Sequence, residues 1–326
     1  MESSRGINQK SFCFIINILD VKSDLPFEII PNHWIEKADK NQIEIIDKFL
    51  DENTTFTMDD IPSLYKSEIK KSVIDGGAIS IAQKLLPEDK YRYYILSFTG
   101  NNSEIFILRN ALNLLKNDLD LGFSYYKDPE SIIDIHHYQT GTLDALTMAR
   151  HFCMKPNLKE PTILNIDDLN EIKEIYKAIK ENDIIEKHEI IWNALINSLL
   201  VKILPPITDL KIVGYFSIIE SILTHKPTPC DKNDSILKQI NTKIPLIKKY
   251  FKREIDYNSY FESENETRIW NTLYNLRSRI AHGNKFNYKK HKTNRLKVMN
   301  FFKEFIKPLL IMAIENPAYI KELKER

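Results

Sequence analysis

The spacing of hydrophobic positions changes near residue 155. Before it, runs rich in Ile, Phe and Tyr, typical of strands, alternate with runs whose apolar residues recur every three or four positions, typical of helices. Strands are expected over residues 10–22, 91–100, 122–127 and 131–138, and helices over 38–52 and 102–118. After it, helical spacing continues over 161–183, 184–204, 207–225, 233–251, 264–283 and 292–317. The pattern predicts an α+β N-terminal domain over residues 1–158 and an all-α helical bundle over residues 159–326.

Short polar stretches mark expected helix starts and the expected domain boundary. Asp59–Asp60 and Asp167–Asp168 are expected at helix starts, where acidic side chains are favourable. The stretch KPNLKEPT, around residues 155–162, is the expected domain boundary.

The composition narrows the classes of protein. With 8 Gly and no G-x-G-x-x-G or Walker A pattern, the chain lacks the glycine loops that cradle nucleotide phosphates. The longest apolar runs fall far short of the ~20 residues of a membrane span, so no membrane partner is expected. The N-terminus lacks a signal-peptide layout, which predicts a cytoplasmic protein. Cys13, Cys153 and Cys230 are far apart and are expected to be free thiols, and neither a metal site nor a cofactor is predicted.

Charge is distributed unevenly along the chain. Residues 1–150 carry 16 Lys and Arg against 23 Asp and Glu, whereas residues 151–326 carry 30 against 22. The net charge of +1 therefore combines an acidic first half with a basic second half. Such asymmetry suggests a polyanionic partner for one of the halves.

Residues 273–283, LYNLRSRIAHG, place an arginine and a histidine five positions apart at the end of a predicted helix. On a helical wheel, one narrow apolar stripe must face the core, formed by Ile269, Leu273, Leu276 and Ile280. At about 100° per residue from Ile269, Arg277 lies near 80° and His282 near 220°, away from that stripe. Gly283 is expected at the C′ position, which places His282 in the last turn or cap.

This pair alone is a weak signal, because chance predicts about 0.25 pairs at that spacing in a chain of this composition. Its surroundings strengthen it. Residues 284–303 hold seven basic residues and no acid, of which five are candidate RNA ligands: Lys285, Lys289, Lys290, Lys292 and Arg295. Residues 238–253 hold six basic residues and no acid. Phe286, Tyr288 and His291 interleave with the first run, as in surfaces that bind phosphates and unstacked bases, although a solvated lysine-rich surface would give the same pattern.

LYNLRSRIAHG, together with FSIIESILTH and the helix SILKQINTKIPLIKKYF, closely resembles the Apea-like branch of the HEPN superfamily. That branch pairs a helix of the form IE-(S/A)-L with a later LY-x-x-R-S-x-(I/V)-x-H-G. The resemblance covers roughly residues 190–315 and implies a HEPN-like helical bundle. In active members this domain is a metal-independent endoribonuclease whose site is assembled across a dimer.

By that resemblance Arg277 and His282 are the catalytic pair, with Tyr274, Ser278 and Glu220 in support. Ser278 takes a position where many members carry Asn, Asp or His. Glu220 matches the acidic residue of the earlier helix, where structural pairing with a basic residue is as much expected as a role in the site. The resemblance also implies an RNA partner, a homodimer, and a toxin or phage-defence role with residues 1–158 as sensor or regulator. A phage trigger and a cognate inhibitor are left open.

These residue types agree with RNA cleavage without metal. A histidine titrates near neutral pH and can donate or accept the proton, while an arginine stays charged and binds phosphate oxygens. One histidine cannot be acid and base together, so a second copy in a symmetric dimer would supply the other, and the small Ala281 would let two helices approach closely.

Other histidines are weaker candidates. His136 and His137 lie in a predicted strand and point to opposite faces, so they cannot share a metal. His188 and Trp192, at helical spacing, are expected to be packing residues. The alternative to an enzyme is a non-catalytic RNA- or protein-binding and dimerisation module, and a metal-dependent enzyme is a third class.

Overall fold

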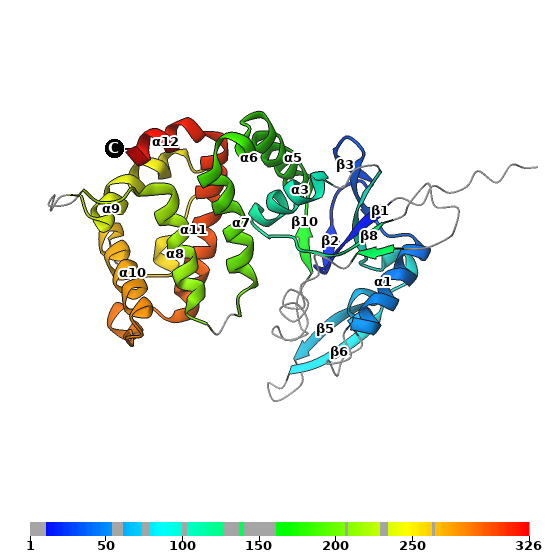
Figure 1. The fold of residues 1–326 in the computed structure, drawn as a ribbon. Coiled ribbons are helices and arrows are strands. Elements are labelled where there is room, and N and C mark those ends of the chain that lie inside the picture. Colours follow the sequence, from blue (N-terminus) through cyan, green and yellow to red (C-terminus); the bar gives the residue numbers. More distant parts are fainter. Residues whose placement is uncertain are drawn as a thin grey trace, which may run out of the picture. The chain divides into compact units, whose positions relative to one another are not determined.

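The structure is a computed structural model, and its elements are drawn in Figure 1. It describes residues 11–53, 61–73, 79–99, 103–126, 137–139, 161–205, 208–228, 234–262 and 265–325. The chain forms two compact units, one of residues 1–112 with 119–173 and the other of residues 113–118 with 174–326. The predicted boundary between residues 158 and 159 lies outside the described residues.

The first unit contains an antiparallel sheet of six strands in the order β3-β4-β7-β1-β8-β9. Its strands are β1 (Ser11–Ile15), β3 (Phe27–Ile30), β4 (His33–Lys37), β7 (Tyr94–Phe98), β8 (Leu121–Tyr126) and β9 (His137–Gln139). The helices α1 (Lys40–Asn53) and α2 (Ile61–Lys66) pack on the sheet through a core that includes Phe14, Phe49, Tyr65 and Phe123. The rings of Phe49 and Phe123 stack with centroids 4.1 Å apart.

Smaller elements complete this part of the chain. Strand β2 (Leu19–Val21) pairs in parallel with β10 (Thr162–Leu164), and β5 (Ser67–Val73) pairs antiparallel with β6 (Ile79–Leu85). A 3₁₀ turn covers Glu88–Lys90, and helix α3 spans Ser103–Leu114.

The second unit is helical. Its helices are α5 (Ile166–Glu181, which begins in the first unit), α6 (Ile184–Lys187), α7 (Glu189–Ile203), α8 (Leu210–Leu223), α9 (Ile236–Ile247), α10 (Glu266–Ala281), α11 (Arg295–Glu315) and α12 (Pro317–Glu325). Short 3₁₀ turns follow at Lys248–Tyr250, Tyr257–Ser259 and Tyr288–His291. Helix α8 is central, because it contacts α7, α9, α10, α11 and α12 and buries most of its residues. Gly214 allows α7 to approach closely, since a Cβ there would lie 2.5 Å from Cγ2 of Val201.

Residues 113–118 contribute a buried carboxylate to the helical unit. Asp118 lies within ion-pair distance of the ammonium groups of Lys202, Lys303 and Lys307. Burial alone would raise the pKa of Asp118, but the three lysines outweigh it and hold that pKa well below its ordinary value. Burial lowers the pKa of Lys307 to about 7, against the attraction of Asp118. The Lys307 ammonium also donates to the carbonyls of Leu115 and Lys116, the two residues that directly follow α3.

The predicted order of an α+β region followed by helices is confirmed. Segment 10–22 forms two strands rather than one, and β3 to β6 were not predicted. Segment 161–183, predicted to be helical throughout, begins with strand β10, and its helix α5 starts at Ile166. Segment 184–204 is two helices divided at His188, and α12 begins at Pro317, where the last predicted helix ends. Asp167 and Asp168 lie in the first turn of α5, as expected. The pair Asp59–Asp60, residue His136, residues Cys153 and Cys230, and most of the strand predicted over 131–138 lie outside the described residues.

No helix in the described part of the chain is long and apolar enough to cross a membrane. Among the same residues, no group of three or more His, Cys, Asp or Glu side chains is arranged to hold a metal ion.

Candidate functional site

Helix α10 ends in a Schellman motif that fixes the backbone of His282. The N–H of Gly283 donates to the carbonyl of Ile280 at 3.0 Å, and the N–H of Asn284 donates to that of Arg279 at 2.8 Å. Gly283 has φ +69°, a left-handed conformation that side chains other than glycine's disfavour. His282 is the C-cap residue, as the position of Gly283 predicted, and its side chain is exposed. Its ring has no hydrogen-bond partner within the described residues.

Arg277 lies at the contact between α10 and α8. Its Nη2 donates to Oε2 of Glu220 at 2.8 Å, and the Arg277 side chain keeps 31% of its surface exposed. The helical wheel places Arg277 off the apolar stripe, and the structure shows that α8 packs against that flank. Ile269, Leu273 and Leu276 of the stripe are fully buried, whereas Ile280, near the helix end, is partly exposed.

The carboxylate of Glu220 is shielded from water. Its side chain keeps 16% of its surface exposed, and burial raises the pKa of Glu220 despite the opposing charge of Arg277. Nε of Arg277 is buried and has no hydrogen-bond partner in the structure. The pair therefore holds the guanidinium in one place and leaves it with unused donors.

Tyr274 and Ser278 lie near the Arg277–Glu220 ion pair on α10. The ring of Tyr274 meets Phe216 of α8 edge to face, with centroids 6.0 Å apart. Phe216 and Glu220 are one helical turn apart on α8, and they face Tyr274 and Arg277, one turn apart on α10. Phe216 was not predicted as part of the site, although its four-residue spacing from Glu220 was the available signal. Ser278 is half-buried, and its carbonyl accepts from the N–H of His282 at 3.1 Å.

The lysines after α10 divide into two groups. Lys285, Lys289, Lys290 and Lys292 are exposed and make no ion pair with any described residue. In contrast, Nε of Arg295 lies 2.6 Å from the carboxylate of Asp209, so the charge of this predicted RNA ligand is already compensated. Farther along, Lys297 lies 4.0 Å from Glu262 and Lys303 lies 2.7 Å from Asp118.

The aromatic residues of this loop contact one another. The rings of Phe286 and His291 stack with centroids 5.1 Å apart, and Tyr288 meets Phe286 edge to face at 5.1 Å. Nδ1 of His291 lies 3.3 Å from Oγ1 of Thr272, a contact to α10 that the sequence did not suggest. All three rings are half-buried, so they shape the loop, and the four exposed lysines offer its ionic contacts.

The second basic run, residues 238–253, is largely engaged within the unit. Lys243 is buried and donates to the carbonyl of Lys324, Lys248 pairs with Glu266 at 3.1 Å, and Lys252 contacts Glu315 at 2.5 Å. This run therefore offers much less free charge than its sequence suggests.

The remaining histidine candidates are placed as follows. His188 is the N-cap residue of α7, and Trp192 is half-buried one turn later. His137 begins β9.

Comparison of the chain with models of known protein families, with curated proteins and with solved structures finds no match.

Proposed function

We propose that the helical unit is a metal-independent endoribonuclease in which Arg277 and His282 are the catalytic pair. The observation that carries this proposal is the contrast between the two side chains: a guanidinium held by Glu220, and an exposed imidazole without a partner at the end of the same helix. The four exposed lysines that follow directly, at residues 285, 289, 290 and 292, supply positive charge next to that imidazole in sequence.

Each side chain has a defined role in this scheme. Arg277, fixed by Glu220, uses its remaining N–H groups to stabilise the negative charge that develops on the phosphorus centre. His282 takes the proton of the attacking 2′-hydroxyl or gives a proton to the leaving 5′-oxygen. Because one imidazole cannot do both at once, the complete site takes His282 from each of two copies in a homodimer.

By the resemblance described above, this ribonuclease is a HEPN-type toxin or phage-defence effector, with the N-terminal region as its sensor or regulator. The N-terminal sequence pattern predicts that it acts in the cytoplasm. The charge pattern supports RNA as the partner, because four exposed lysines that make no ion pair with any described residue lie close together between α10 and α11.

A non-catalytic RNA- or protein-binding module is the second candidate, and one observation favours it. Arg277 makes the ion pair that a purely structural arginine would make, so its conformation alone does not require catalysis. In that case the lysine loop would bind RNA and His282 would do no chemistry.

Incubation of the purified protein with total RNA, with and without EDTA, separates these possibilities. We expect cleavage that survives EDTA and falls about 100-fold or more in His282→Ala. Arg277→Lys keeps a cation for Glu220 but loses the planar fork, so it is expected to lose cleavage while staying folded. Arg279→Lys, two residues later on the same helix, is the matched control and should cleave like the parent. Intact RNA that remains bound would identify the binding module, and cleavage abolished by EDTA would identify a metal-dependent enzyme.

A further inference from the structure

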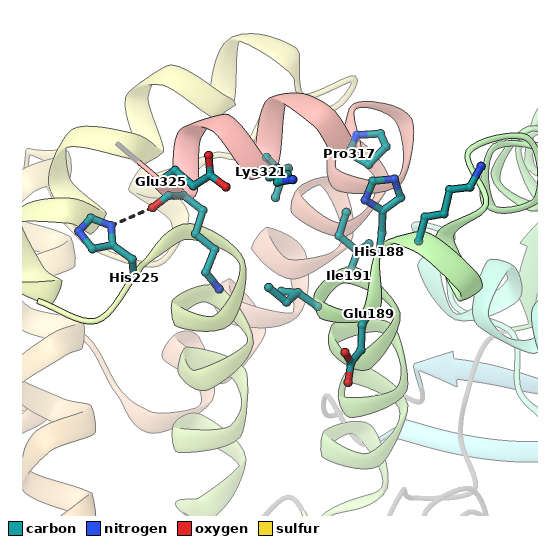
Figure 2. Close-up of a pocket in the computed structure, with 11 residues that line it drawn as sticks. His188, Glu189, Ile191, His225, Pro317, Lys321 and Glu325 are labelled. Atoms are coloured by element: carbon teal, nitrogen blue, oxygen red, sulfur yellow. Dashed lines mark hydrogen bonds between the residues drawn. The ribbon is translucent and has the colours of Figure 1, made fainter.

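The helical unit contains a cavity of about 460 Å³ between the junction of α6 and α7, helix α12 and the residue that follows the α8 cap (Figure 2). It is lined by Lys187, His188, Glu189, Ile190, Ile191, His225, Pro317, Ile320, Lys321, Lys324 and Glu325. Figure 2 shows His188 beside Pro317 at one end of the cavity and His225 at the other end. Nδ1 of His225 is hydrogen-bonded to the carbonyl of Lys324. The volume is within the range of small-molecule sites. None of these residues belongs to the proposed ribonuclease site.

The floor of the cavity is apolar. Ile191 and Ile320 are almost fully buried, and Pro317 adds its ring beside them. Ile190, which also lines the cavity, keeps 46% of its surface exposed and so adds apolar surface that a ligand could cover. The floor therefore suits a hydrophobic body.

Two lysines of α12 also line the cavity. Lys321 is exposed and Lys324 is half-buried, and neither has a carboxylate partner among the residues the structure describes. Nζ of Lys324 donates to the carbonyl of Ser221 at 2.5 Å, which leaves other N–H groups of this ammonium unused. Burial lowers the pKa of Lys324, so an anion beside it would be favourable.

Two carboxylates also line the cavity, and their positions determine which part of it is more positive. Glu189 points away from α12 in Figure 2, and it is the first residue of α7. Glu325 lies at the opposite end of the cavity from His188. The space between Lys321 and the His188 end is therefore the more positive part, and the start of α7 there has no side-chain cap.

We propose that this cavity binds a small organic anion, with an apolar body against Ile191 and Ile320 and a carboxylate or phosphate group next to Lys321. This inference is independent of ribonuclease activity. Binding requires both the apolar body and the anionic group of the ligand. The apolar residues alone do not select for charge, and the exposed lysine alone binds anions weakly.

The test uses the fluorescent anion 1-anilinonaphthalene-8-sulfonate and its neutral analogue N-phenyl-1-naphthylamine with the full chain. We expect one sulfonate dye per chain and weaker binding of the neutral analogue. Ile190→Asp and Lys321→Glu should each raise the dissociation constant about five-fold or more. The matched controls are Leu200→Asp, at another exposed position of α7, and Lys249→Glu, an exposed lysine away from the cavity. Both controls should stay within about two-fold.

Competition then identifies the head group. Displacement of the dye by phenyl phosphate at lower concentration than by 4-phenylbutyrate would assign a phosphate ligand, and the reverse order would assign a carboxylate. The proposal is overturned if the sulfonate dye does not bind, if the neutral analogue binds equally well, if the two cavity variants bind like their controls, or if neither competitor displaces the dye.

Discussion

Replacing Arg277 by alanine removes the cation that Glu220 contacts across the α8–α10 interface, and the expected result is a loss of stability that His282→Ala does not share. Glu220 keeps only 16% of its side-chain surface exposed, and water reaches its carboxylate poorly. In Arg277→Ala this carboxylate must either stay ionised without its partner or take up a proton. Both choices destabilise the folded state.

The size of the effect follows from the two choices. Protonating a carboxyl whose ordinary pKa is 4.5 costs about 3 kcal/mol at pH 7, which sets an upper limit. Allowing for relaxation and water entry, we expect Arg277→Ala to lose about 1–3 kcal/mol of unfolding free energy at pH 7. His282 is exposed at the helix cap, so His282→Ala should stay within about 0.5 kcal/mol of the parent.

The sign of the pH dependence is fixed by the raised pKa of Glu220. A carboxyl whose folded pKa lies above its unfolded value favours folding below pH 4.5 and loses that contribution as pH rises through the folded pKa. Loss of Arg277 raises this pKa further. The gap between parent and Arg277→Ala should therefore be largest near pH 7 and shrink toward pH 4.5.

Urea unfolding at pH 5 and pH 7, followed by tryptophan fluorescence, measures this gap, since Trp270 is buried in α10 itself. The double variant Glu220→Gln with Arg277→Ala should recover part of the loss, because no charge is then left buried. Equal stability of Arg277→Ala and His282→Ala at pH 7, or a gap that does not depend on pH, would refute this reasoning. It would mean that the ion pair contributes nothing to the fold.

Three further outcomes are expected. Gly283→Ala should lower the unfolding free energy by about 1 kcal/mol in urea titrations, because φ is +69° there although a Cβ would meet no atom within 4 Å. Replacing Lys289, Lys290 and Lys292 together by alanine should flatten the slope of log K for RNA against log salt by roughly 2, and an unchanged slope would mean that RNA is held elsewhere. The lowered pKa of Lys307 means that the folded state holds its proton less tightly, so the unfolding free energy should rise with pH from about 7 upward, and this rise should be absent in Lys307→Met.

Helix periodicity was the most informative part of the sequence. The long helices α5, α10 and α11 follow apolar spacing and end close to the expected residues, because each buries one continuous stripe. Pro308 lies inside α11 without ending it. The strands β3 to β6 were missed because they are short or mix polar with apolar residues, so their pairing depends on neighbours distant in sequence.

The candidate site was predictable only in part. The capping role of Gly283 follows from local chemistry, whereas the placement of Arg277 depends on which helix packs beside α10, and a wheel of one helix does not contain that information. The charge of a lysine run is similarly non-local. Arg295 is compensated by Asp209, 86 positions away, and Lys303 by Asp118, on a segment from the first half of the chain. Counting basic residues therefore overstated the free charge of both runs.

The carboxylate of Asp118 also limits whether the helices after residue 173 can be moved to another protein without residues 113–118. Its three lysine partners lie on α7 and α11, yet Asp118 itself comes from six residues that precede most of the unit by more than fifty positions. A contiguous stretch containing only the helices after residue 173 would lack the carboxylate that two nearly buried lysines, Lys202 and Lys307, contact in the full chain. Recombination that exchanged the helical part alone would remove these ion pairs, so Asp118 and its three lysines are expected to change together over evolution.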